Sequence, residues 1–262
     1  MTISEIWLKG KAVVTKNRIL FLLPFLLDLV LYGPLAFISA RVINFKLTVP
    51  SSLPTIQNLL PEAAMFSGAQ SGVNFNMGYP GTLTVGFAGT IIAFTLVPYL
   101  TGGYLGTIVQ ELRGDEERMP FMALASKYFV RLFIMRILVM VAFMGLVLIL
   151  TIVPFLAFIM VPVLIAVTVL LLFWDFSIVY DDMDLIPAIS KAYAVMKGNL
   201  PPVINNLLPV IILLMPLTLG ASLLVGSPLF LLVIAVYAYI GAVIISGLVY
   251  LYSSLVTGEY QE

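Results

Sequence analysis

The sequence predicts an all-α polytopic membrane protein with six transmembrane helices, built as three repeats of an interfacial amphipathic helix followed by a helical hairpin. Hydrophobic residues make up 61% of the 262 residues and charged residues 10%, and the mean hydropathy of +1.12 is far above that of soluble domains. The segment between Arg136 and Asp175 contains no charged side chain. It is roughly twice as long as the ~20 apolar residues that one helix needs to cross a bilayer, so we expect it to cross twice.

Composition also excludes several classes of function. The chain has no Cys and no His, so it cannot build the usual zinc sites, a thiol nucleophile or a histidine general base. The signature motifs of serine hydrolases, zinc proteases and phosphate-binding loops do not occur in it. The formal net charge is zero, whereas nucleic-acid binding needs a face of clustered Lys and Arg. We therefore expect a protein that is not an enzyme, binds no cofactor or metal, and has no nucleic-acid partner.

Six apolar segments can each cross the membrane as a helix that rises about 1.5 Å per residue. They lie near residues 19–43, 82–109, 132–153, 156–178, 203–225 and 229–251 of a single transmembrane domain, residues 1–262. The first segment follows Lys16 and Arg18, as the apolar part of a secretory signal would. Because it is longer than the roughly 7–15 apolar residues of such a signal, a retained helix is favoured over a cleaved one.

The distribution of Lys and Arg predicts the orientation. Basic residues cluster before the first span, between the second and third, and between the fourth and fifth, whereas the opposite side has only Arg41 and Lys46. Basic flanks stay in the cytoplasm, so both termini are expected there. The external segment 44–80 is rich in Pro, Ser, Gly and Asn, which favours a loop on the outer surface over a lid that gates a ligand. A short helix that carries Ile56 is predicted to start at Ser52.

Two cytoplasmic segments share one plan, in which acidic residues and a proline precede an amphipathic stretch. Acidic residues at 115–117 precede Pro120, and acidic residues within 181–184 precede Pro187; residues 3–17 form a more diverged copy. We interpret the acidic residues as helix starts, because negative charge there complements the helix dipole. The alternative for the second acidic group is that it binds a divalent metal in an enzyme that acts on lipid at the membrane interface. We favour duplication of a stable hairpin as the origin of this repeat. The alternative is that it is a functional repeat of the kind found in transporters.

Three short motifs carry a resemblance to known proteins. They read Leu100-Thr-Gly-Gly-Tyr-Leu-Gly, Glu111-Leu-Arg-Gly-Asp and Ala188-Ile-Ser-Lys-Ala-Tyr-Ala-Val-Met-Lys-Gly-Asn. Over most of its length the chain resembles prokaryotic six-helix integral membrane families of unknown function, which include the membrane domain fused to some glycerophosphodiester phosphodiesterases. The resemblance implies the six-helix fold and the plasma membrane of a prokaryote, and it implies no activity.

Asp28 is the deepest charged residue of the predicted spans. A charge near the bilayer centre costs about 2.5–3.5 kcal/mol on insertion scales, so Asp28 must face protein or water. Counting inward along antiparallel spans brings it level with Tyr99 and Thr101, either of which can donate a hydrogen bond to it. These three residues form the predicted intramembrane polar site. A structural bond between helices is favoured over a proton or cation relay.

Arg136 and Asp175 are predicted to form an ion pair. Their midpoint in the sequence lies just beyond Pro154, where the third and fourth spans must turn, so antiparallel packing places them at the same depth. Such a pair fixes the register of the hairpin, and a role in transport is the less favoured alternative.

The second span is rich in Gly and Thr, which lets a neighbouring helix approach closely. Gly102 and Gly106 form a small-xxx-small pair, for which packing within the chain and formation of a homodimer are both open. The favoured function is a non-catalytic scaffold that binds membrane lipids, or a protein partner through its cytoplasmic helices. A permease subunit or small-solute transporter that uses Asp28 and the second span is the main alternative.

Overall fold

The computed structural model describes residues 3–37, 52–56, 80–115, 117–152 and 157–258. In these residues the secondary structure is entirely helical, which confirms the all-α prediction. The elements are α1 (Ile3–Lys16), α2 (Ile19–Tyr32), the 3₁₀ helix η1 (Gly33–Phe37), α3 (Pro80–Arg113), α4 (Phe121–Ile152), α5 (Ala157–Tyr180), α6 (Leu185–Gly198), α7 (Leu200–Leu224) and α8 (Phe230–Thr257).

Each of the six apolar segments corresponds to one long helix or, for the first, to α2 and η1. The predicted boundaries agree within a few residues for α5, α7 and α8, because Gly and Pro residues or charges flank these helices. Residues 38–43 of the first predicted span lie outside the described residues. By length and composition, α7 with 25 residues and α8 with 28 can cross a membrane; these are the helices of the described part that meet both criteria.

Of the three amphipathic helices predicted as separate elements, two are separate and the third is not. The helices α1 and α6 are separate elements of 14 residues each. The amphipathic stretch after Pro120, in contrast, is continuous with the third span in the 32-residue helix α4. The physical reason is local: Gly198 and Asn199 end α6, whereas α4 contains no proline to break it near Arg131.

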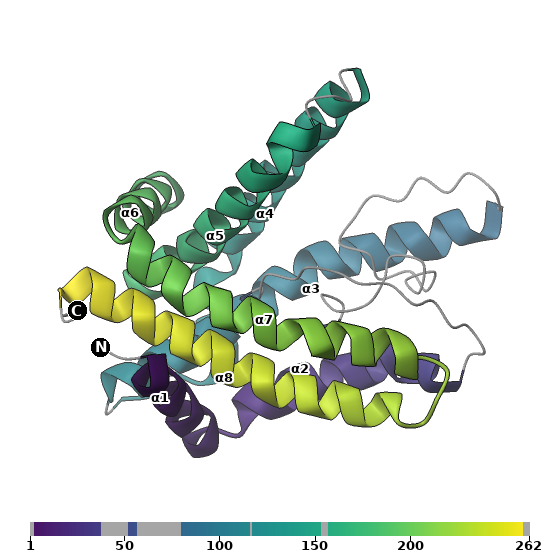
Figure 1. Cartoon of the computed structure of the whole chain (residues 1–262), viewed down its shortest axis with the longest axis horizontal. Helices are drawn as coiled ribbons and strands as arrows, with labels where there is room; N and C mark the ends of the chain where they lie inside the picture. Colours follow the sequence, from purple (N-terminus) through teal and green to yellow (C-terminus); the bar gives the residue numbers. More distant parts are fainter. Residues whose placement is uncertain (1–2, 38–51, 57–79, 116, 153–156, 259–262) are drawn as a thin grey trace.

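Four helices run along the long axis of the molecule, and one hairpin departs from them. Figure 1 shows α2, α3, α7 and α8 extended along this axis, while α4 and α5 leave at an angle, and both termini lie at one end with α1 and α6. At the opposite end, the Gly226 amide donates to the Leu35 carbonyl of η1 at 2.9 Å. The helix α8 is the central one, since nearly every side chain from Gly241 to Val249 is buried, whereas α7 leaves one face open.

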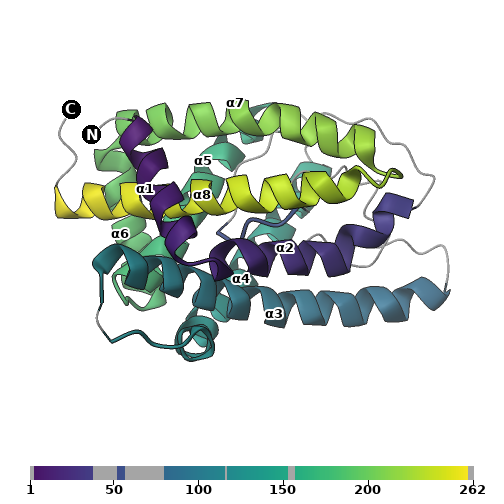
Figure 2. The ribbon, with the colours of Figure 1, turned by 90° about the horizontal axis from the view of Figure 1, so that it is seen from below.

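The helix α1 crosses α8 at backbone contact (Figure 2). A Cβ atom added to Gly10 would lie 2.4 Å from the carbonyl oxygen of Val243, and one added to Gly247 would lie 3.1 Å from the carbonyl oxygen of Ile6. Only glycine fits at Gly10, because real Cβ atoms do not approach an oxygen this closely. The crossing fixes α1 beneath the bundle near the termini.

The two glycines of the small-xxx-small pair pack within the chain. A Cβ on Gly102 would lie 3.1 Å from the Cβ of Tyr128, and a Cβ on Gly106 would lie 3.1 Å from the Cβ of Leu124. Both neighbours belong to α4, which is the main packing partner of α3. Intrachain packing, one of the two predicted uses of this pair, is therefore the one observed.

Candidate functional site

A short segment of the predicted external loop lies inside the helix bundle. Of the described residues Ser52–Ile56, four are buried, with Ser52 2% exposed and Ile56 fully buried. The predicted surface position is therefore wrong for these residues; the rest of 44–79 is outside the described part of the chain. The segment combines apolar side chains, which gain from burial, with two polar groups that find acceptors in the bundle.

Three helices hold this segment. The Ser52 hydroxyl donates to Oδ2 of Asp175 in α5. The Ile56 amide donates to Oδ2 of Asp28 in α2 at 2.7 Å. Between them, Pro54 lies against α8, where a Cβ on Gly241 would be 2.5 Å from the Pro54 Cβ. We call Ser52–Ile56 the bridging segment, because it joins two buried carboxylates on helices far apart in the sequence.

The predicted pair of Arg136 and Asp175 is present. Nη2 of Arg136 lies 2.8 Å from Oδ2 of Asp175, and the Asp175 side chain is 2% exposed. The pair joins α4 to α5, as expected for antiparallel helices that turn near Pro154. The same carboxylate oxygen also accepts from Ser52, a contact that the sequence did not predict. Ser52 is too far from Asp175 in the chain for any local pattern to indicate the contact.

The structure does not assemble the predicted polar site of Asp28, Tyr99 and Thr101. The Tyr99 hydroxyl lies 3.5 Å from both the Met122 carbonyl and the Ser126 hydroxyl of α4. The Thr101 hydroxyl donates to the Val97 carbonyl of its own helix at 2.7 Å. The Tyr99 hydroxyl faces α4, the main packing partner of α3, whereas α2 packs chiefly against α8. The Thr101 hydroxyl is used within α3 itself, so the predicted depth alone does not decide which groups meet.

Asp28 differs from Asp175 in its charge partners. Both side chains are buried, and each keeps one carboxylate oxygen, Oδ1, without a hydrogen-bond partner in the described part of the chain. Asp175 pairs with the Arg136 guanidinium, whereas Asp28 accepts a hydrogen bond from the neutral Ile56 amide. Within the described residues, Asp28 is therefore the less compensated of the two carboxylates.

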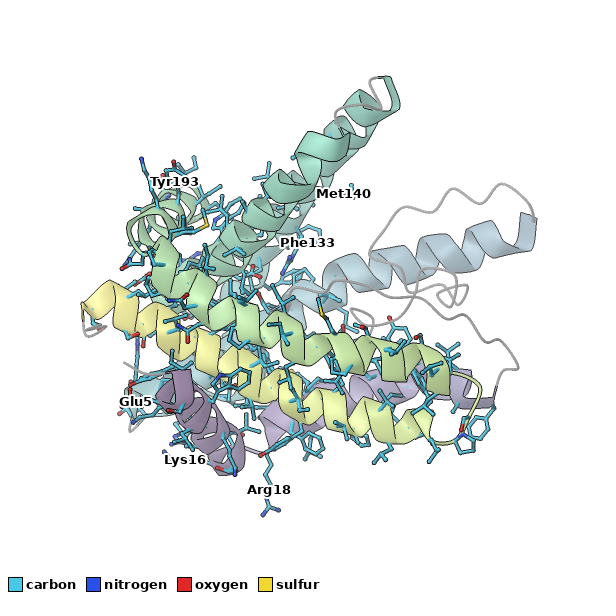
Figure 3. All side chains as sticks on the ribbon, viewed as in Figure 1. Glu5, Lys16, Arg18, Phe133, Met140 and Tyr193 are labelled. Carbon is cyan, nitrogen blue, oxygen red and sulfur yellow. The ribbon has the colours of Figure 1, made fainter. Side chains whose placement is uncertain are left out.

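A second group of polar residues surrounds Glu111 at the end of the molecule that carries both termini, which we call the charged end. The Glu111 side chain is 3% exposed and pairs with Lys16 at 2.5 Å and with Arg118 at 2.8 Å. Beside it is a cavity of about 180 Å³. Its lining joins polar and apolar side chains: Asn17, Thr107, Gln110, Glu111 and Arg118 with Ile19, Met119 and Phe121. In Figure 3 the neighbouring Arg18 side chain points away from the bundle.

Ion pairs also occupy the acidic residues that follow α5. Asp182 lies 2.8 Å from Lys127 and 2.7 Å from Arg131, and Arg131 also reaches Asp184 at 3.2 Å. The hydrogen bond from Lys127 lowers the pKa of Asp182 below its usual value. Asp182 adopts φ of +54°, a left-handed conformation that turns the chain from α5 toward α6.

The third acidic residue, Asp181, joins α5 to α6 and α8. It accepts from the Tyr252 hydroxyl at 2.6 Å and pairs with Lys191 at 2.7 Å. Tyr252 also shares a hydrogen bond of 2.6 Å with Ser177. The three acidic residues therefore pair with several cations. The described residues contain no group of three or more His, Cys, Asp or Glu side chains that could hold a metal ion.

The structure thus defines an all-helical protein with two helices apolar enough to cross a membrane, a bridging segment held by buried carboxylates, and a charged end with a polar cavity. No family model, no curated protein and no solved structure matches the chain. The assignment of function therefore depends on the geometry of these two sites.

Proposed function

We propose that the chain is a six-span integral membrane protein without catalytic activity, whose charged end binds the headgroup of an anionic membrane lipid. The spans in this proposal are α2 with η1, α3, α4, α5, α7 and α8. Support comes from the lengths of α3, α4 and α5, which are 34, 32 and 24 residues, and from the two candidate spans α7 and α8. We also propose that the chain is related to the prokaryotic six-helix membrane families that its three short motifs resemble.

The open face of α7 supports a lipid environment. It carries a stripe of large apolar side chains that are each 40% or more exposed: Ile204, Leu208, Ile212, Leu219 and Leu223. Soluble monomers rarely expose a contiguous apolar surface of this kind, whereas lipid tails cover it without cost. Most basic residues of the described part lie on α1, on α6 or near the C-terminal end of α3, and Figure 1 shows these parts at the charged end, which supports a cytoplasmic position for that end and for both termini.

The observation that carries the lipid proposal is the cavity beside Glu111. Two cations, Lys16 and Arg118, flank this one buried carboxylate, so the group keeps one surplus positive charge. The cavity also touches Ile19, the first residue of the apolar helix α2, and thus lies where an apolar span meets its polar flank. A lipid phosphate suits such a site, because its charge meets Arg118 while its glycerol region meets Met119 and Phe121.

Native mass spectrometry of the protein released from its own membrane tests this proposal. We expect the wild type to retain anionic phospholipid in a fixed ratio, and Arg118→Gln to retain clearly less. Arg18→Gln is the matched control, because it removes the same charge from a side chain that points away from the bundle. Equal retention in the two variants would contradict a specific site. A stoichiometric soluble subunit would instead favour a scaffold that recruits a protein partner.

Transport of a small solute is the second candidate, and Asp28 is the observation that favours it. This carboxylate is buried within the proposed first span and has no cation partner among the described contacts. Against transport, α3 uses the glycines of its predicted solute-facing surface to pack on α4. Loss of solute flux in Asp28→Asn proteoliposomes, with retained folding, would favour transport over the scaffold.

A further inference from the structure

The bridging segment has two ends of unequal strength. At one end the Ser52 hydroxyl donates to Asp175, whose charge Arg136 balances at 2.8 Å. At the other end the Ile56 amide donates to Asp28 at 2.7 Å. In the middle, Pro54 rests on Gly241 of α8 with no room for a Cβ atom between them. Among the described residues, the attachment at Asp28 is therefore the one that depends on a carboxylate without a balancing cation.

The surroundings of Asp28 offer few other charges. On its own helix, Tyr32 lies one turn further and interacts electrostatically with the Asp28 carboxylate. On the helices packed against α2, the buried titratable side chains near mid-helix are Tyr104 of α3 and Tyr237 of α8, which interact with each other. The Lys residues of α1 lie at the charged end, where Lys16 pairs with Glu111, and η1 contains no titratable residue. In the described part of the chain, no cation pairs with Asp28.

The protonation state of Asp28 changes the bond that holds the segment. A hydrogen bond from an amide to an ionised carboxylate is roughly twice as strong as one to a neutral acceptor. When Asp28 is ionised, the Ile56 amide is its stabilising partner; when a proton neutralises it, that amide is held more weakly and the cost of an isolated buried charge disappears. Because burial of an unpaired charge costs more than one hydrogen bond returns, seating of the segment over Asp28 and binding of a proton favour each other, and linkage makes the effect reciprocal.

We propose that Asp28 is a proton-binding site that controls the seating of the bridging segment Ser52–Ile56 in the bundle. Protonated Asp28 lets the segment sit between α2, α5 and α8, and ionisation releases its Ile56 end so that water reaches the carboxylate. Asp175 keeps its charge through Arg136 and acts as the constant anchor. This device goes beyond lipid binding at the charged end and does not depend on it, because the two sites share no residue.

The chain contains no cysteine, so a single introduced thiol can report on the segment. Thr55→Cys places the thiol at the half-buried position of the segment, and Leu229→Cys places a reference thiol at an exposed position beside α8. The measurement is the rate of labelling by a polar maleimide in the full-length protein in lipid nanodiscs, given as the ratio of the two thiols at each pH. This ratio removes most of the pH dependence of thiol chemistry itself.

We expect the ratio to rise about fivefold when the pH rises from about 5 to about 8, because hydration of the ionised carboxylate then favours release of the segment. In Asp28→Asn the ratio should stay at its low-pH value throughout. The matched control is the double variant Arg136→Gln with Asp175→Asn, which removes the other anchor and leaves the net charge unchanged. It should keep the pH dependence, because Asp28 is intact. Gly241→Ala should raise the ratio at every pH by displacing Pro54, which verifies that the thiol senses seating.

Two results would overturn the proposal. One is a ratio that does not change with pH while Gly241→Ala still raises it. The other is a pH dependence that persists in Asp28→Asn, since a different group would then control the segment. Neither result would affect lipid retention at the charged end, so failure of this inference and failure of the proposed function are separate outcomes.

Discussion

The charged end and the bundle interior use the same kinds of residue in opposite ways. At the charged end, Asp182 has two cation partners, Lys127 and Arg131, and its side chain is 47% exposed. In the interior, Asp175 has one cation partner and is 2% exposed. Water and duplicate partners make each contact of Asp182 replaceable, whereas the contact with Arg136 is the main compensation of the buried Asp175. The position of a carboxylate, more than its partner, therefore sets the cost of changing it.

The most severe test of this comparison is Arg136→Gln. It leaves the Asp175 carboxylate buried with the Ser52 hydroxyl as its remaining partner, so we expect a loss of about 3 kcal/mol in unfolding free energy. This value is at the low end of the range for broken buried pairs, because the Arg136 side chain is 29% exposed. Reversible unfolding in mixed micelles measures the loss.

A double-mutant cycle with Asp175→Asn provides the control for this prediction. If the pair is coupled, the double variant should recover a clear part of the stability that Arg136→Gln loses. Strictly additive losses would mean that the guanidinium and the carboxylate act independently, and the contrast between the two regions would then fail.

The second test addresses the crossing of α1 and α8, which joins the charged end to the interior. Gly10→Ala should cost about 1–3 kcal/mol, because its Cβ would meet the Val243 carbonyl at 2.4 Å and α1 would have to move. Gly220→Ala in α7 is the matched control, since a Cβ there meets nothing within 4 Å. The control should be neutral or slightly stabilising, by up to about 1 kcal/mol. Equal stability of the two variants would show that the crossing tolerates expansion.

Tyr252→Phe should have an intermediate effect. The substitution removes a hydroxyl that bonds both Asp181 and Ser177 at 2.6 Å, and it retains the ring that packs against Phe173 and Phe176. We expect a loss of about 1 kcal/mol in thermal or chaotrope unfolding. A much larger loss would mean that this tyrosine belongs to the irreplaceable contacts of the interior.

Asp182→Asn should give the smallest effect, less than about 1 kcal/mol after screening by solvent. The pKa of Asp182 is lowered in the folded state, so its contribution is present above the unfolded value of about 3.9 and is lost as the pH falls through the lower folded value. The stabilities of wild type and variant should therefore converge in acid. A difference that persists below the folded pKa would indicate a role for this residue other than its charge.

Local sequence patterns determined the elements of this fold. Runs of apolar residues between charges predicted the long helices, and equal distance from the turn predicted the contact of Arg136 with Asp175. Each of these features depends on neighbouring residues or on one hairpin. For this reason the chain order alone carries the necessary information.

Tertiary structure alone decided which faces and segments meet. Depth placed Asp28 level with Tyr99 and Thr101, but the Tyr99 hydroxyl lies against α4 and the Thr101 hydroxyl donates to the Val97 carbonyl of its own helix. The polar composition around Ser52 indicated a surface loop, yet buried carboxylates on α2 and α5 supply the acceptors that let this segment enter the bundle. Such contacts depend on how helices distant in sequence are turned about their axes. Periodicity along one chain does not encode that rotation, because it is a property of packing between helices.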